Sequence, residues 1–221
     1  MSSIEFQIYP GFAIPFVSTA YPESGSLNDA LRQVFLEREA RGAEFANARP
    51  TMSAGSGLFE SRFDLFRWDV PSVARLRDFC TAAVFRVVAE LNGYGKDEMD
   101  ALEMSADAWF HVMRKGSSFG QHNHPMASWS GIYCVDTGYP AGQEPESGEV
   151  HFSHPNQTAG MFTDLGVANI RTPWSLKSRR QRLLPGELVI FPSWLVHQVT
   201  PYTGDGERIT VAFNAWFKAV G

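Results

Sequence analysis

The hydrophobic period of the sequence changes near Ala101, and this change limits the folds that the chain can adopt. Before it, apolar residues recur at helical spacing; after it, short alternating segments are separated by Gly and Pro. Helices followed by a run of strands predict an α+β arrangement, or a barrel or sandwich backed by helices. We expect a single domain of 221 residues, with a helical preface over 1–100 and a strand-rich core over 101–221.

Two helices are expected in the preface. The first begins at Ser26, which we predict to be the N-cap with Asp29 in the capping-box position, and it ends at Gly42. The second begins at Pro71, carries a broad apolar stripe and ends at Gly93. The 20 residues at the N-terminus alternate irregularly around prolines, which favours an edge strand.

Six segments in the second half alternate with period two and are predicted to be strands. These are Ala106–Met113, Trp129–Val135, Glu149–Ser153, Glu187–Phe191, Val196–Thr200 and Arg208–Phe217. In the last of them, Arg208, Thr210, Ala212 and Asn214 share one face, and the apolar residues between them share the other.

Charge and composition exclude several classes of protein. The net charge of -5 argues against nucleic acid or an anionic membrane as the main partner, and 17 Phe and 6 Trp exclude a disordered chain. The sequence has no apolar run of membrane-spanning length and no signal-peptide pattern at its start. Two cysteines, Cys80 and Cys134, fit a reducing compartment. We therefore expect a cytoplasmic protein whose partner is a small-molecule or peptide substrate; a homodimer is compatible with this.

Three histidines form a candidate metal site. His122 and His124 are two residues apart, so on an extended strand their side chains point to the same face. His197 comes 75 residues later and needs only to lie on a neighbouring strand. Imidazole binds iron, zinc and copper, so the three histidines specify a metal site better than they specify the metal.

A guanidinium and a hydroxyl follow the third histidine. A hairpin about the turn Pro201–Glu207 would bring Arg208 and Thr210 beside the strand of His197. Such a pair, close to a metal but not bound to it, suits a carboxylate whose far end chelates the ion. A dicarboxylic keto acid has this shape.

Five segments together resemble the 2-oxoglutarate/Fe(II)-dependent oxygenase superfamily, and more narrowly a bacterial and phage branch with an H-x-H-P motif. They occur in the expected order over roughly the last half of the chain. The segments are His122–Pro125, Ser130–Tyr133, Ser147–Phe152, Pro185–Pro201 and Arg208–Asn214.

The resemblance implies a double-stranded β-helix core, a jelly-roll or cupin-like fold, backed by the two helices. Its metal would be Fe(II), with His122 and His197 among the ligands. Arg208 and Thr210 would bind the far carboxylate of 2-oxoglutarate, and Tyr133 would line that pocket. The implied activity is that of a dioxygenase that uses O₂ and 2-oxoglutarate, hydroxylates an unactivated C–H bond and releases succinate and CO₂.

One position departs from the superfamily pattern, because most members carry Asp or Glu where this chain has His124. If His124 binds, three neutral imidazoles hold the ion and leave its charge uncompensated until the co-substrate arrives. Three protein ligands also leave no vacancy for a halide, which favours hydroxylation or desaturation over halogenation. Alternatively, His124 turns away and Asp136, Asp164 or a water completes the site.

Two other classes of protein stay open at this point. One is a three-histidine metalloenzyme without 2-oxoglutarate, either thiol dioxygenase-like or a zinc lyase or hydrolase; the other is a non-catalytic jelly-roll binding protein. The pairing of Arg208 with Thr210 favours the oxygenase. His111 could point into the pocket, and His151 and His154 could be structural or face the substrate.

Two loops are further candidates for substrate contact. The cationic stretch Arg171–Arg182 is either a solvated loop or a surface that meets an acidic substrate, and the loop around Ser53–Gly57 could act as a lid.

Overall fold

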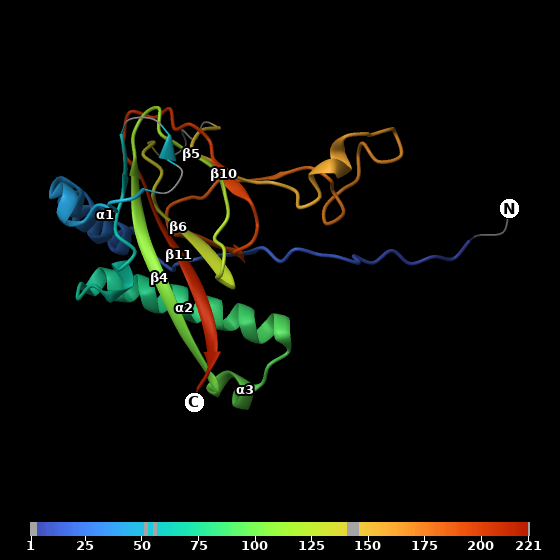
Figure 1. The fold of residues 1–221 in the computed structure, drawn as a ribbon, viewed down its shortest axis with the longest axis horizontal. Helices are drawn as coiled ribbons and strands as arrows, with labels where there is room; N and C mark the ends of the chain where they lie inside the picture. The colour runs from blue at the N-terminus through green and yellow to red at the C-terminus, as the bar shows by residue number, and fades with distance from the viewer. Residues whose placement is uncertain (1–3, 51–52, 55–56, 141–145, 221) are drawn as a thin grey trace.

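The protein consists of two antiparallel sheets that face each other, with two long helices on the outer face of the larger sheet (Figure 1). The structure is a computed structural model that describes residues 4–50, 53–54, 57–140 and 146–220. Its α-helices and 3₁₀ helices are α1 (Gly25–Ala40), η1 (Gly42–Glu44), η2 (Leu65–Arg67), α2 (Pro71–Asn92), α3 (Lys96–Asp100) and η3 (Gln157–Gly160). Its strands are β1 (Val17–Ala20), β2 (Ser53–Ala54), β3 (Leu58–Glu60), β4 (Leu102–Met113), β5 (Ser118–His122), β6 (Trp129–Asp136), β7 (Val150–Phe152), β8 (Arg179–Gln181), β9 (Glu187–Pro192), β10 (His197–Val199) and β11 (Arg208–Ala219).

The order of the strands shows how the chain passes between the two sheets. The larger sheet has the order β1-β9-β6-β11-β4-β3, and the smaller sheet has the order β2-β5-β10-β7-β8. Consecutive strands therefore alternate between the sheets from β4 to β7 and again from β9 to β11. This is the arrangement of a double-stranded β-helix, so the predicted core backed by two α-helices is confirmed.

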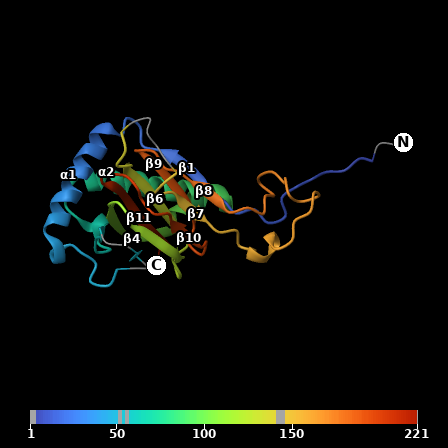
Figure 2. The same cartoon turned by 90° about the horizontal axis from the view of Figure 1, so that it is seen from above.

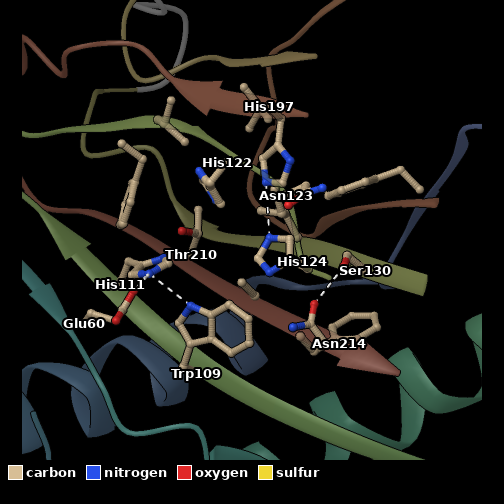
Figure 3. A pocket seen from close by; sticks show the side chains of 18 of the residues that line it. Glu60, Trp109, His111, His122, Asn123, His124, Ser130, His197, Thr210 and Asn214 are labelled. Carbon is tan, nitrogen blue, oxygen red and sulfur yellow. Dashed lines mark hydrogen bonds and ion pairs between the residues drawn. The ribbon is translucent and has the colours of Figure 1, made fainter. Parts of the chain in front are cut away.

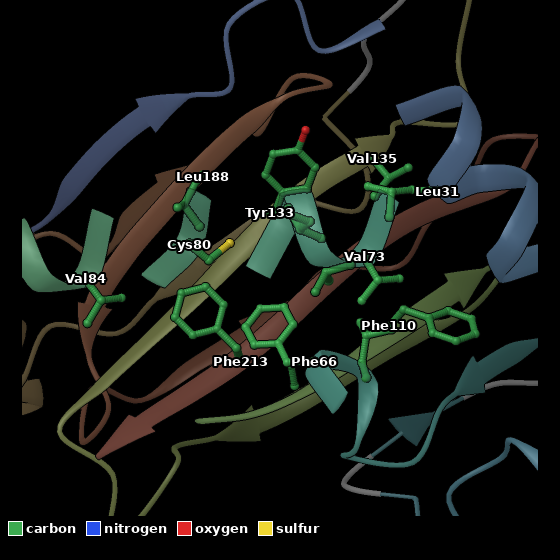
Figure 4. Close-up of a cluster of buried hydrophobic side chains, with 14 of the residues drawn as sticks. Leu31, Phe66, Val73, Cys80, Val84, Phe110, Tyr133, Val135, Leu188 and Phe213 are labelled. Carbon is green, nitrogen blue, oxygen red and sulfur yellow. The ribbon is translucent and has the colours of Figure 1, made fainter. Parts of the chain in front are cut away.

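The two helices cover the larger sheet through one apolar cluster (Figure 4). In α2, residues such as Val73, Cys80 and Val84 recur at helical spacing and face the sheet, which offers Phe110 and Phe213 in return. Burying this stripe is what fixes the helix, because an isolated amphipathic helix is marginally stable in water.

The ends of the helices test the predicted boundaries. Helix α2 begins at Pro71, where a proline is tolerated because an N–H in the first turn has no acceptor within the helix. The helix ends at Gly93, whose φ of 67° is the left-handed conformation that Gly adopts readily. Both ends are as predicted. The predicted start of α1 is wrong: the N-cap is Ser24, which makes no side-chain capping bond, and Ser26 already lies within the first turn.

Several strands differ from the prediction in length or were not predicted. Strands β4 and β11 pair along their full 12 residues and run further than the alternation indicated. The predicted edge strand exists over Val17–Ala20 alone, where it pairs with β9. The short strands β2, β3 and β8 were not predicted, since their pairing depends on partners far away in the sequence.

Two segments extend away from the sheets on the same side of the molecule, as the views in Figures 1 and 2 agree. They are the N-terminal residues before β1 and the connection between β7 and β8, which carries much of the cationic stretch. Arg180 and Arg182 of that stretch pair with Glu146 and Glu149. The proposed lid around Ser53–Gly57 lies partly outside the described residues. Within the described part of the chain, no helix has the length and apolar character needed to cross a membrane.

Candidate metal centre

Three histidines of the smaller sheet converge on one point (Figure 3). His122 ends β5 and His197 begins β10, and the two residues are directly paired where these strands lie side by side. His124 follows two residues after β5 ends. One ring nitrogen from each histidine lies within 4.8 Å of the other two, and the described residues contain no other such group of His, Cys, Asp and Glu side chains.

Backbone carbonyls hold two of the rings in one tautomer. The Nδ1 atom of His122 lies 2.7 Å from the Gly120 carbonyl oxygen, and Nδ1 of His197 lies 2.9 Å from that of Leu195. A carbonyl oxygen only accepts, so Nδ1 carries the proton in both rings and Nε2 keeps its lone pair. Such a bond on the remote nitrogen is how metal-binding histidines are commonly oriented.

Burial keeps two of the three histidines neutral. Desolvation, followed by the charge of His122, lowers the pKa of His197 to about 3 and that of His124 to about 4. Both rings are therefore uncharged near neutral pH, as a metal ligand must be. The donor set thus fits a borderline divalent ion such as Fe(II) or Zn(II).

A cavity of about 210 Å³ opens between the two sheets, in front of the histidines. Its opposite wall is β11, which turns the alternate residues Arg208, Thr210, Ala212 and Asn214 toward the cavity. The predicted hairpin is wrong, because β11 pairs with β4 and β6 in the larger sheet and not with β10. Arg208 and Thr210 consequently face the histidines across the cavity.

The guanidinium of Arg208 is buried without an acidic partner. Its residue is 7% exposed, its Nη1 lies 3.3 Å from the Met113 sulfur, and no ion pair to it occurs among the described residues. Burial lowers the pKa of Arg208, although an arginine stays charged in proteins. A buried charge is costly unless it is paired, so this position fits the carboxylate of a bound ligand.

Tyr133 does not line the cavity, contrary to the prediction. On β6, its neighbour Ile132 faces the cavity, so Tyr133 points to the other side of the sheet and lies in the cluster beneath the helices. There its hydroxyl donates a hydrogen bond of 2.7 Å to Asn28 Oδ1 of α1. Its role in the structure is to join the sheet to that helix.

Neither of the two carboxylates considered as alternatives to His124 belongs to the histidine group. Asp136 forms an ion pair of 2.9 Å with Arg32 of α1, and Asp164 lies in the connection between β7 and β8. His151 and His154 also lie outside the cavity lining; His151 contacts Glu149 at 3.3 Å. The structure thus brings together the three histidines of the prediction and none of these alternatives.

A second polar group lines the cavity, and the sequence predicted only one of its members, His111. His111 faces the cavity, with its Nε2 3.1 Å from Glu60 Oε2 and 3.1 Å from the indole Nε1 of Trp109, which donates to it. Burial lowers the pKa of His111. Glu60 could not be assigned to the site from the sequence, because β3 was not predicted. Trp109 could have been found, since it alternates with His111 on one strand.

Comparison with known proteins shows which family the chain resembles. Residues 107–214 match a family model described as "Putative 2OG-Fe(II) oxygenase". Over this stretch, just under half of its length, the chain is similar to the 2-oxoglutarate/Fe(II)-dependent oxygenases. The matched part of this oxygenase runs from β4 to β11 and contains the three histidines, Arg208 and Thr210. The resemblance indicates an enzyme that uses Fe(II) and 2-oxoglutarate, and both fit the donor set and the buried guanidinium described above.

Solved structures share the fold of this oxygenase. A prolyl-4-hydroxylase from Pseudomonas putida is 18% identical, with 94% of each chain covered and a TM-score of 0.59. AviO1 from Streptomyces viridochromogenes Tue57 is 15% identical, with 92% and 90% covered and a TM-score of 0.59. HygX from Streptomyces hygroscopicus, solved with nickel, 2-oxoglutarate and hygromycin B, is 13% identical, with 92% and 83% covered and a TM-score of 0.55. No curated protein sequence matches the chain.

Proposed function

We propose that this oxygenase uses O₂ to hydroxylate an unactivated C–H bond of a small-molecule or peptide substrate; one oxygen atom enters the substrate and the other enters the succinate that forms, with CO₂, from 2-oxoglutarate. The observation that carries the proposal is the placement of the two walls of the cavity. Three imidazoles converge on one side, and a buried guanidinium without an ion-pair partner among the described residues faces them, together with a neighbouring hydroxyl, from the other.

Each wall has a separate task in this proposal. His122, His124 and His197 would hold the iron, and Arg208 with Thr210 would bind the distal carboxylate of 2-oxoglutarate. Iron and 2-oxoglutarate supply the oxidative chemistry when bound. The protein positions both and keeps water away.

The charges support this assignment. Three neutral ligands leave the +2 charge of the iron uncompensated by the protein, and Arg208 adds a further positive charge. A dianion that reaches both groups places a carboxylate beside each of them and lowers the net charge of the site from +3 to +1, and a buried charge is stable only when it is paired. 2-Oxoglutarate carries one carboxylate at each end and has this charge distribution.

An anaerobic titration tests the proposal. Fe(II) and 2-oxoglutarate added to metal-free protein should produce a visible charge-transfer absorption, which His197→Ala should lack. Admission of O₂ should then release succinate. Tight zinc retention with no absorption and no succinate would overturn the proposal in favour of a three-histidine zinc enzyme.

Two solved structures with the same fold indicate which substrates to examine. One is a prolyl hydroxylase from Trichoplax adhaerens in complex with a peptide fragment of hypoxia inducible factor, and the other is HygX with hygromycin B. These ligands belong to those proteins. For this chain we propose the same two broad classes, peptides and small molecules. The cavity of about 210 Å³ holds only a compact group beside the co-substrate, and a member of either class can present such a group.

A further inference from the structure

One face of β11 forms a row that crosses the whole cavity. Arg208, Thr210, Ala212 and Asn214 alternate along the strand and all line the cavity. At roughly 3.3 Å per residue, the row places Asn214 about 20 Å from Arg208. If Arg208 binds the co-substrate, as the proposed function requires, Asn214 lies at the end left for the substrate.

Two buried serines determine how the Asn214 side chain is oriented. Ser193 Oγ lies 2.8 Å from Ser130 Oγ, and Ser130 donates a hydrogen bond of 2.7 Å to Asn214 Oδ1. With this orientation Ser193 donates to Ser130, Ser130 donates to Asn214, and each hydroxyl proton has an acceptor. If the amide turned over, Ser130 would have to donate to Ser193, whose own buried proton has no other acceptor among the described residues.

The orientation leaves the amide NH₂ of Asn214 directed at the cavity, as Figure 3 shows. The structure records no protein acceptor for this group among the described residues. It is therefore a fixed donor in the cavity wall, held by hydrogen bonds on its oxygen side only.

The rest of this end of the cavity is largely aromatic. The Trp109 and Phe63 rings pack with their centroids 4.3 Å apart, and the indole N–H of Trp109 is already used by His111. Of the charged lining residues, Arg208 lies at the other end of the row and Glu60 is held against His111. A ligand here meets aromatic surface and the amide donor of Asn214.

We propose that Asn214 donates a hydrogen bond to an uncharged oxygen acceptor of the substrate, and so selects a carbonyl group next to an apolar group. This rests on the proposed function for the direction of the substrate in the cavity. Asn214 is the residue that touches the substrate; Ser130 and Ser193 position its amide.

A matched pair of neutral probes tests the inference. N,N-dimethylcyclohexanecarboxamide and its thioamide have nearly the same shape and no N–H donor, but sulfur accepts hydrogen bonds more weakly than oxygen. Dissociation constants would be measured by saturation-transfer NMR with the protein loaded anaerobically with Fe(II) and 2-oxoglutarate. We expect the wild-type protein to bind the amide at least 5-fold more tightly than the thioamide.

Three variants complete the test. Asn214→Asp replaces the donor with an acceptor of the same shape, so the amide should bind at least 10-fold more weakly and its preference over the thioamide should vanish. Ser130→Ala should reduce the preference in part, because the amide is then free to rotate. Asn156→Asp makes the same charge change on the exposed connection after β7 and should leave both dissociation constants unchanged.

The outcomes separate the inference from the proposed function. If the wild-type protein binds the amide no better than the thioamide, or binds neither measurably, the inference is overturned. The same holds if Asn214→Asp retains the preference. Failure of the wild-type protein to release succinate from 2-oxoglutarate overturns the proposed function instead, and that assay requires neither probe.

Discussion

The Nε2 atoms of His124 and His197 lie 3.3 Å apart. Nε2 of His197 carries a lone pair, because its Nδ1 proton is donated to the Leu195 carbonyl. A proton shared between the two rings would relieve any repulsion, but burial lowers both pKa values well below neutrality. A divalent cation between the rings satisfies both nitrogens without protonating either.

Substitutions of His124 test whether it belongs to the ligand set. We expect His124→Ala to lower Fe(II) affinity by at least 10-fold, since one of three ligands is removed. His124→Asp should retain iron and 2-oxoglutarate-dependent succinate release, because a carboxylate is the usual third ligand in this family. The measurement is iron content after dialysis against graded chelator; full iron retention by His124→Ala would show that this ring does not bind the metal.

Substitutions of Arg208 test the predicted co-substrate contact. Arg208→Ala should raise the KM for 2-oxoglutarate by about 50-fold or more, because charge-assisted hydrogen bonds of this kind contribute about 1.5–3 kcal/mol each. Iron content should not change, as the guanidinium lies across the cavity from the histidines. The KM of Arg208→Lys should lie between those of the wild-type protein and Arg208→Ala, since an ammonium offers a point charge without the planar pair of donors. An unchanged KM in Arg208→Ala would assign the carboxylate to another residue.

Gly148 offers an indirect test of the same contact. A Cβ atom at this glycine would lie 2.8 Å from Cδ and 3.0 Å from Nε of Arg208, so Gly148→Ala should displace the guanidinium and raise the KM for 2-oxoglutarate. Gly93 is the matched control, because its φ of 67° resembles the 64° of Gly148 and nothing lies within 4 Å of its Cβ position. Both variants should lose about 1–2 kcal/mol of stability through left-handed strain. Only Gly148→Ala should change the KM, and equal KM values in the two variants would contradict the prediction.

Tyr133 should matter for stability and not for the co-substrate. Tyr133→Phe removes the buried hydrogen bond to Asn28 and should lower the free energy of unfolding by about 1–2 kcal/mol. The KM for 2-oxoglutarate should stay at the wild-type value, because Tyr133 lies on the helix side of β6. Urea denaturation measures the first quantity and succinate formation the second. A raised KM at wild-type stability would restore the role that the sequence suggested.

The metal-free protein should lose stability as the pH falls below about 6.5. The folded-state pKa values of His124 and His197 are lowered to about 4 and about 3, whereas unfolded histidines titrate near 6.5. Between these values the unfolded chain binds more protons than the folded one, so falling pH favours unfolding. Each histidine adds at most about 1.4 kcal/mol per pH unit. Urea midpoints of chelator-treated protein between pH 7.5 and 5 provide the measurement; a double variant with Gln at both positions should show a shallower slope.

The sequence predicted the parts of the site that depend on strand periodicity. The spacing of two correctly brought His122 and His124 together, although β5 ends at His122, and the same rule placed Arg208 and Thr210 on one side of β11. The rule gives relative positions only. It could not say which face of β6 turns to the cavity, and for this reason Tyr133 was assigned to the wrong side.

Other parts of the site depend on pairing between distant strands, which local patterns do not encode. The three residues of β3 are too few to show a period, so Glu60 could not be connected with His111. No local sequence pattern indicates that the chain crosses to the opposite sheet after β10, and a hairpin between the strand of His197 and that of Arg208 was predicted instead. In both cases the strand partner is fixed by tertiary packing.

Strand β11 has a consequence for how relatives of this enzyme can diverge. Ile209, Val211 and Phe213 belong to the core beneath the helices, while Ala212 and Asn214 border the cavity and are not members of that cluster. Substitutions at 212 and 214 can therefore change which compound is accepted while leaving folding intact. Insertion of a single residue in the strand would exchange the two faces and destroy both properties at once. Selection can thus explore new substrates along this strand by replacement, but not by changes in its length.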